Sequence, residues 1–126
     1  MSTKKILSVG QCFADHGALR RAFQKHFAAE VVGADSGEEA LELLRGEPFA
    51  LVLVNRVLDA DGASGLEVLR QLKVDETGAA VPVMLVSNHE DAQQQAVAAG
   101  AVRGFGKAAL GQPAMLARVR PFLEKV

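Results

Sequence analysis

The sequence predicts an α/β protein in which five parallel strands form one doubly wound sheet with helices on both faces. Five short apolar runs alternate with five helical patterns along the 126 residues, and such alternation implies right-handed crossovers between parallel strands. Two of the runs, Leu51–Val54 and Val83–Val86, are apolar throughout, which is typical of strands buried on both faces. No linker or internal repeat interrupts the pattern, so we expect one domain over residues 1–126.

The predicted strands are short and fall at regular intervals. They are Ile6–Val9, Val31–Ala34, Leu51–Val54, Val83–Val86 and Val102–Phe105. In open α/β sheets, function lies outside the carboxyl ends of the strands, near the switch in strand order. The candidate functional residues are therefore those that directly follow these runs.

The helical patterns carry recognisable start and stop signals. The first predicted helix has one face formed by Leu19, Ala22, Phe23, His26 and Phe27. The second and third begin at capping boxes, Ser36–Glu39 and Ser64–Glu67, in which the serine and glutamate side chains satisfy free amides. Asn88 is expected to cap the fourth helix and Gly100 to end it. The fifth begins near Pro113 and uses Met115, Leu116, Val119, Leu123 and Val126.

Composition excludes several classes of function. Fourteen basic and 15 acidic residues give a net charge of −1, which does not favour nucleic-acid binding. The four-residue apolar run after Lys5 is too short for a signal peptide, and no run approaches a membrane span. Cys12 is the one cysteine, so the fold needs no oxidising compartment. We expect a cytoplasmic protein that binds neither nucleic acid nor membrane.

Four segments stand in the order and spacing of a known family. Phe49–Asn55, Gly65–Leu72, Val81–Ser87 and Ala99–Lys107 resemble the third strand, the following helix, the fourth strand and the fifth strand of the receiver domain of two-component response regulators. The resemblance covers nearly the whole chain. It implies a flavodoxin-like, CheY-like fold of three α/β/α layers with strand order 2-1-3-4-5, and a role in two-component signal transduction or phosphorelay.

The same resemblance assigns site residues, and most depart from the family pattern. The phosphorylated aspartate corresponds to Asn55, and the two acidic residues that hold magnesium correspond to Gly10 and Gln11. The aromatic switch residue corresponds to Gly104, while Phe105, one position later, is expected on the other face by strand alternation. The switch hydroxyl and the family lysine are retained, as Ser87 and Lys107.

Together, these departures remove the groups that phosphoryl transfer requires. The reaction needs a nucleophile, a divalent cation and a positive group. The amide of Asn55 is not a nucleophile, and magnesium prefers carboxylate oxygens that Gly10 and Gln11 do not offer. We therefore predict a degenerate pseudo-receiver that is not an enzyme, has no catalytic residues, and binds no metal or cofactor. Lys107 can donate to the amide oxygen of Asn55, and we expect it either to be partly solvated or to pair with Asp35.

Two alternatives remain open. Asp59 and Asp61 alternate in a glycine-containing loop, and could form a displaced metal site or a surrogate acceptor, although Asp and Gly are also ordinary turn residues. A small anion could bind near Lys107. Cys12 as a redox sensor, and His16, His26 and His89 as metal ligands, are less favoured because neither reactivity nor ligand spacing can be inferred.

The expected output is protein–protein association. In the family, the fourth helix, fifth strand and fifth helix form the partner surface. Here the run Gln93–Gln95 is either a contact face or a solvated helix, and Arg103, Arg118 and Arg120 are expected on or near the surface. The chain would then act by associating with itself or with another signalling protein.

Overall fold

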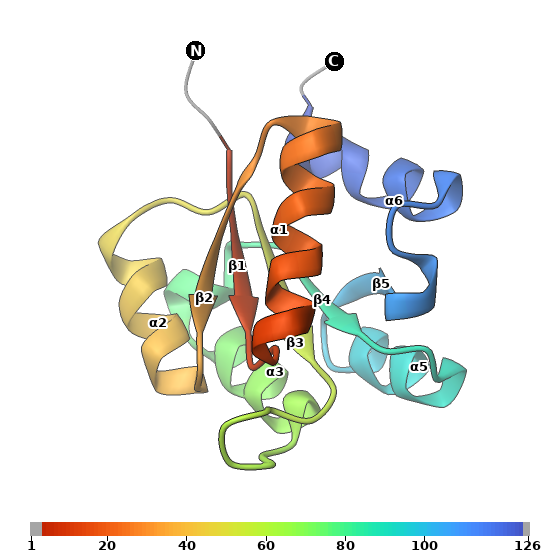
Figure 1. Ribbon diagram of the computed structural model, residues 1–126. Coiled ribbons are helices and arrows are strands. Elements are labelled where there is room, and N and C mark those ends of the chain that lie inside the picture. The colour runs from red at the N-terminus through yellow and green to blue at the C-terminus, as the bar shows by residue number, and fades with distance from the viewer. Residues whose placement is uncertain (1–3, 125–126) are drawn as a thin grey trace.

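The computed structural model describes residues 4–124 and contains one five-stranded parallel sheet (Figure 1). Its strands are β1 (Lys5–Val9), β2 (Glu30–Ala34), β3 (Leu51–Asn55), β4 (Val83–Val86) and β5 (Val102–Phe105). Their order, β2-β1-β3-β4-β5, confirms the predicted fold class. Val126, assigned from the sequence to the last helix, lies outside the described residues.

Helices cover both faces of the sheet. One face carries α1 (Phe13–Phe27) and α6 (Pro113–Leu123), and the other carries α2 (Gly37–Gly46), α3 (Gly65–Val74) and α5 (Glu90–Ala98). Two short elements were not predicted: α4 (Glu76–Ala79), and the 3₁₀ turn η1 (Lys107–Ala109). The first of these is capped by Asp75, whose Oδ1 accepts hydrogen bonds from the amides of Thr77 and Gly78.

Two hydrophobic cores result from the alternation of side chains along the strands. Between the sheet and helices α1 and α6, Ile6 and Leu53 pack with Phe23 and Met115. On the opposite face the core is formed by strand residues together with α2 and α3, and it includes Leu7, Val9, Val52, Val54, Leu41 and Leu69. All four apolar residues of β3, Leu51–Val54, are fully buried, as the continuous run predicted.

In each of the two predicted capping boxes, the serine side chain makes its expected hydrogen bond. Ser36 Oγ accepts from the Glu39 amide at 3.1 Å, and Ser64 Oγ accepts from the Glu67 amide at 3.4 Å. The glutamates do not reciprocate, because the Glu39 carboxylate accepts from the amide of Asp35, while that of Glu67 pairs with a nearby arginine.

The prediction that Asn88 caps α5 is wrong. The residue before this helix is His89, and its amide donates to Ser87 Oγ at 3.1 Å. The Asn88 side chain instead contacts the loop after β5, where its Oδ1 accepts a hydrogen bond from the amide of Ala108 at 3.2 Å. That amide lies in the first turn of η1 and lacks a helical partner there.

Across residues 4–124, the structure holds no helix with the length and hydropathy that crossing a membrane requires.

Candidate functional site

The carboxyl ends of four strands bring the predicted site residues to one edge of the sheet. Gly10 and Gln11 follow β1, Asn55 ends β3, Ser87 follows β4, and Lys107 follows β5. A cavity of about 240 Å³ at this edge is lined by Asn55, Ser87 and Lys107, together with neighbouring loop residues. The structure therefore brings these three together, whereas Gly10 and Gln11 do not line this cavity.

Asn55 acts as a hydrogen-bond donor that ties two loops together. Its Nδ2 donates to the carbonyl oxygen of Gly10 at 3.1 Å and to that of Val57 at 2.7 Å. Both partners are acceptors, so the contact requires an NH₂ group. A carboxylate at this position has no proton to donate at neutral pH and would face two carbonyl oxygens.

Gly10 occupies a turn that excludes a side chain. Its φ of 76° is in the left-handed region, and a Cβ there would overlap the fully buried Leu58 side chain. The carbonyl of Gly10 also accepts from the amide of Asp59 at 2.9 Å, so the β1–α1 turn and the β3–α3 loop are closely joined. The space that a carboxylate would need is filled by Leu58.

Asp59 and Asp61, in the loop between β3 and α3, do not line the cavity beside Asn55. Asp61 accepts from the amide of Ala63 at 2.9 Å through Oδ1, as expected for a solvated turn. Asp59 is exposed and lines a different cavity, between β1 and β2. Among residues 4–124, no three His, Cys, Asp or Glu side chains gather in a way that could hold a metal ion.

Lys107 pairs with an acid that the sequence did not indicate. Its Nζ lies 2.6 Å from Asp15 Oδ2 on α1, and both side chains are partly exposed. The predicted partners, the Asn55 amide oxygen and Asp35, are wrong because the first turn of α1 places Asp15 beside the start of η1. The hydrogen bond from Lys107 lowers the pKa of the Asp15 carboxyl, and burial partly opposes this.

This pair should give the domain a small pH-dependent stability. A lowered folded-state pKa means that the contribution is complete above the unfolded pKa of Asp and is lost as pH falls through the folded value. Replacing Lys107 with methionine should cost about 0.5 kcal/mol at pH 7, because the pair is solvent-screened. Urea unfolding of both proteins at pH 7, and at the lowest pH where they stay folded, checks this. If the variant loses the same free energy of unfolding at both pH values, the ion pair is not the source of the pH dependence.

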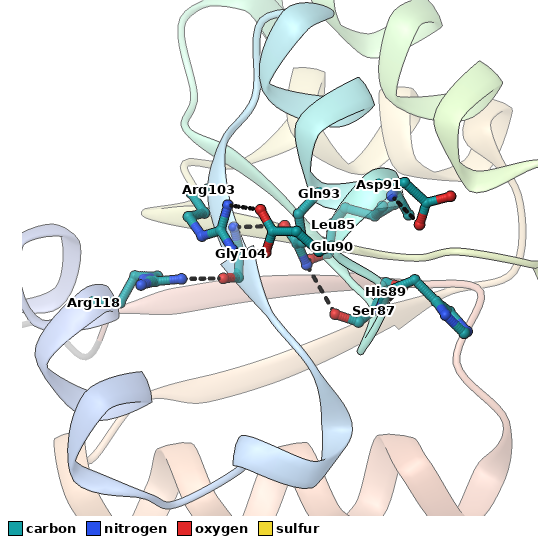
Figure 2. Close-up of polar contacts among 10 residues, drawn as sticks. Leu85, Ser87, His89, Glu90, Asp91, Gln93, Arg103, Gly104 and Arg118 are labelled. Atoms are coloured by element: carbon teal, nitrogen blue, oxygen red, sulfur yellow. Dashed lines mark hydrogen bonds and ion pairs between the residues drawn. The ribbon is translucent and has the colours of Figure 1, made fainter.

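Gln93 is buried and bridges β4 to β5, so the prediction of a contact face or a solvated helix is wrong for this residue (Figure 2). Its Nε2 donates to the carbonyl oxygens of Leu85 and Ser87 at 2.9 and 3.0 Å, and its Oε1 accepts from the amide of Gly104 at 3.0 Å. The ladder between the strands shifts register here, since Met84 pairs with Val102 but Val86 pairs with Phe105. The side chain of Gln93 therefore satisfies backbone groups that the bulge leaves unpaired.

Gly104 leaves no room for the aromatic switch residue that the resemblance would place at this position. A Cβ there would overlap the carbonyl oxygen of Leu85, so a side chain would force the two strands apart. The carbonyl of Gly104 accepts from Arg118 on α6 at 2.7 Å. Phe105 is buried in the core below α1 and α6, on the opposite face, as predicted.

The sequence model of one protein family, described as the response regulator receiver domain, matches residues 14–120. The chain belongs to this family. No curated protein matches this chain closely enough to count as a relative.

Solved structures share the fold of this chain. A candidate response regulator from Chloroflexus aurantiacus is 20% identical, with a TM-score of 0.82 over 98% of this chain and 100% of the other. The chemotaxis response regulator CheY4 of Vibrio cholerae is 18% identical, with a TM-score of 0.73 over 97% and 100%. A response regulator from Burkholderia pseudomallei, solved with a phosphorylated aspartic acid and a calcium ion, is 23% identical, with a TM-score of 0.73 over 91% and 66%. At such identities these neighbours establish the fold.

The residues of this receiver domain do not fit the divalent cation that the family implies. Gly10 has no side chain, Asn55 offers one neutral amide oxygen in place of a carboxylate, and the Oε1 and Nε2 atoms of Gln11 are buried. Hard cations need several oxygen ligands around one point. This edge of the sheet does not supply them.

Proposed function

We propose that this receiver domain works without phosphorylation, as a cytoplasmic signalling module whose output is association with a protein partner. It is not an enzyme under this proposal, because the position that corresponds to the family's phosphorylated aspartate carries Asn55, whose neutral amide is not a nucleophile. The observation that carries the proposal is the pair of hydrogen bonds from Asn55 Nδ2 to the carbonyls of Gly10 and Val57. The asparagine makes contacts that an aspartate cannot make, so the position serves the fold instead of the reaction.

The proposed partner surface is formed by α5, β5 and α6, and we call it the α5–β5–α6 face. It contains a groove of about 370 Å³ with Arg103 and Arg118 at its wall. Arg103 pairs with Glu90 across the groove, and Arg118 is tied to the backbone of Gly104 (Figure 2). Gln93 joins α5 to both strands, so the face is held in one arrangement. A fixed face suits a partner that binds constitutively.

A phosphoryl-incorporation experiment tests this proposal. Wild-type protein and Asn55→Asp are incubated with acetyl phosphate and Mg²⁺, and incorporation is read by intact mass, beside a receiver that retains its acidic pair and aspartate. We expect the reference protein to be labelled and both forms of this chain to remain unlabelled. Asn55→Asp restores a nucleophile but supplies no metal ligands, and metal stabilisation of such transition states is worth several kcal/mol.

Magnesium-dependent labelling of the wild-type chain would overturn the proposal. Mapping the modified residue would then show whether Asp59 or Asp61 acts as the acceptor. Rapid labelling of Asn55→Asp alone would show that the missing acids at Gly10 and Gln11 matter less than the geometry indicates.

A further inference from the structure

The two helices beside the edge strand β2 carry charges of opposite sign. α1 and α2 both contact β2, and they cover opposite faces of the sheet (Figure 1). The lysine and arginine residues of α1 are all exposed, and they are Arg20, Arg21 and Lys25. The acids of α2 are also all exposed, and they are Glu38, Glu39 and Glu42. The net charge of −1 therefore hides a separation of charge between two surfaces on either side of one strand.

These charges are not neutralised by ion pairs within the described part of the chain. α1 contains one acid, Asp15, which pairs with Lys107, and α2 contains one base, Arg45, which pairs with Asp75. Among residues 4–124, the three bases of α1 form no ion pair with an acid, and the three acids of α2 form none with a base. Both sets are therefore available to a partner of opposite charge.

The spacing of the charges makes each helix repel itself. Arg21 and Lys25 lie four residues apart on α1, and Glu38 and Glu42 lie four residues apart on α2. Residues at this spacing are neighbours on a helix surface, where like charges destabilise the helix. A monomer has this repulsion on both helices. Contact with a surface of opposite sign relieves it, and the two pairs complement each other.

The placement of α1 and α2 makes the molecule complementary to a second copy of itself. A twofold axis beside β2 and parallel to this strand turns the second copy over, so that α1 of each copy lies on the same side as α2 of the other. The basic surface then meets the acidic surface twice, as in the isologous interfaces of symmetric dimers. A twofold axis perpendicular to the sheet would instead bring α1 against α1 and α2 against α2, an arrangement that charge repulsion opposes.

We propose that this receiver domain forms a twofold homodimer through α1 and α2, with the two β2 edges facing each other. β5 lies at the opposite edge of the sheet, so the α5–β5–α6 face of each copy stays free. The dimer then carries two such faces, which raises its avidity for a partner that has two binding motifs. This last consequence rests on the proposed function, whereas the dimer itself does not.

Sedimentation velocity of the full chain tests the dimer. We expect a reversible monomer–dimer equilibrium, and raising NaCl from about 20 mM to about 300 mM should weaken association at least about tenfold, because salt screens exposed charges. A chain that stays monomeric at the lower salt would overturn the proposal, and its co-sedimentation with phosphatidylserine vesicles would then assign α1 to a lipid surface. Association that salt leaves unchanged, or species that grow beyond a dimer, would also contradict it.

Charge-swap variants test which helices meet. Arg21→Glu with Lys25→Glu reverses the α1 pair, and Glu38→Lys with Glu42→Lys reverses the α2 pair. Each double variant should dimerise at least about tenfold more weakly than wild type, because like charges then face each other. The chain with all four changes keeps the net charge of −1 and should dimerise within about threefold of wild type. An equimolar mixture of the two double variants should form a heterodimer for the same reason.

Arg103→Glu is the control for association through the α5–β5–α6 face. Arg103 lines the groove of that face and belongs to neither α1 nor α2, so its reversal should leave the dimer unchanged. Circular dichroism shows whether each variant is folded, and the salt dependence of the wild-type chain tests the dimer even where a variant does not fold. A folded four-change chain that fails to dimerise would refute the pairing of α1 with α2. A loss in Arg103→Glu as large as that in the α1 variant would place the contact elsewhere and refute it too.

Discussion

Gly10→Asp should destabilise this receiver domain by about 3–5 kcal/mol, a loss in the range that marks a disrupted core. The substitution adds a Cβ that overlaps the buried Leu58 side chain, at a φ of 76° where non-glycine residues are strained. It also places a carboxylate beside the buried end of β1. Urea unfolding monitored by circular dichroism measures the free energy of unfolding.

Gly62 provides the matched control for this substitution. Its φ of 72° is similar, but a Cβ at this position meets no atom within 4 Å. Gly62→Asp should therefore cost about 1 kcal/mol, the backbone term alone. Equal losses for the two variants would show that the overlap with Leu58 is relieved at no cost, and that the turn could accept an acid.

This geometry bears on any attempt to restore phosphorylation. Returning the three missing acids requires changes at Gly10, Gln11 and Asn55 together. The first change is opposed by Leu58, and the last removes two hydrogen bonds that join the β1–α1 turn to the β3–α3 loop. Because one change adds an overlap and the other removes hydrogen bonds, we expect both to weaken the fold.

Local patterns were enough to predict the five strands and the five longer helices of this fold. The bounds of β4 and β5 coincide with the apolar runs, and Ser36 and Ser64 begin helices through the predicted serine contacts. These features depend on residues that are near one another in sequence. Apolar periodicity and capping are therefore sufficient to locate them.

The contacts of the site could be predicted less well, because they join distant segments. Lys107 and Asp15 are 92 residues apart, and no local pattern relates them. The resemblance placed Asn55 at the position of the family's phosphorylated aspartate, but no local pattern indicated the two carbonyls that its amide reaches. Those contacts depend on the path of the loop between β3 and α3, and loop paths are set by tertiary packing.

Two signals could have located Gln93. It stands three residues before Ala96 on the side of α5 that faces the sheet, where a polar residue needs a partner. Gly104 lies inside a strand, and an isolated glycine there indicates a bulge or a close approach of backbone. Taken together, a buried glutamine and a strand glycine on neighbouring elements indicate a side chain that repairs an irregular ladder.

Replacing Gln93 with leucine should cost about 3 kcal/mol, because it leaves buried backbone groups without partners at roughly 1–3 kcal/mol each. The carbonyls of Leu85 and Ser87 and the amide of Gly104 would all lose their hydrogen bonds. Leucine keeps a similar volume, so lost packing contributes little. Gln94→Leu, at an exposed position on the same helix, should change stability by less than about 0.5 kcal/mol.

Hydrogen exchange locates the effect of the Gln93 substitution. The amide of Gly104 donates to Gln93 Oε1 and should exchange much faster in Gln93→Leu than can be explained by the change in global stability. Amides of β1 and β3 should follow the global change alone. If Gly104 keeps its protection, or if Gln94→Leu is equally destabilising, then the bridge does not hold β4, β5 and α5 together. The α5–β5–α6 face would then be free to rearrange, and a constitutive partner surface would lose its structural basis.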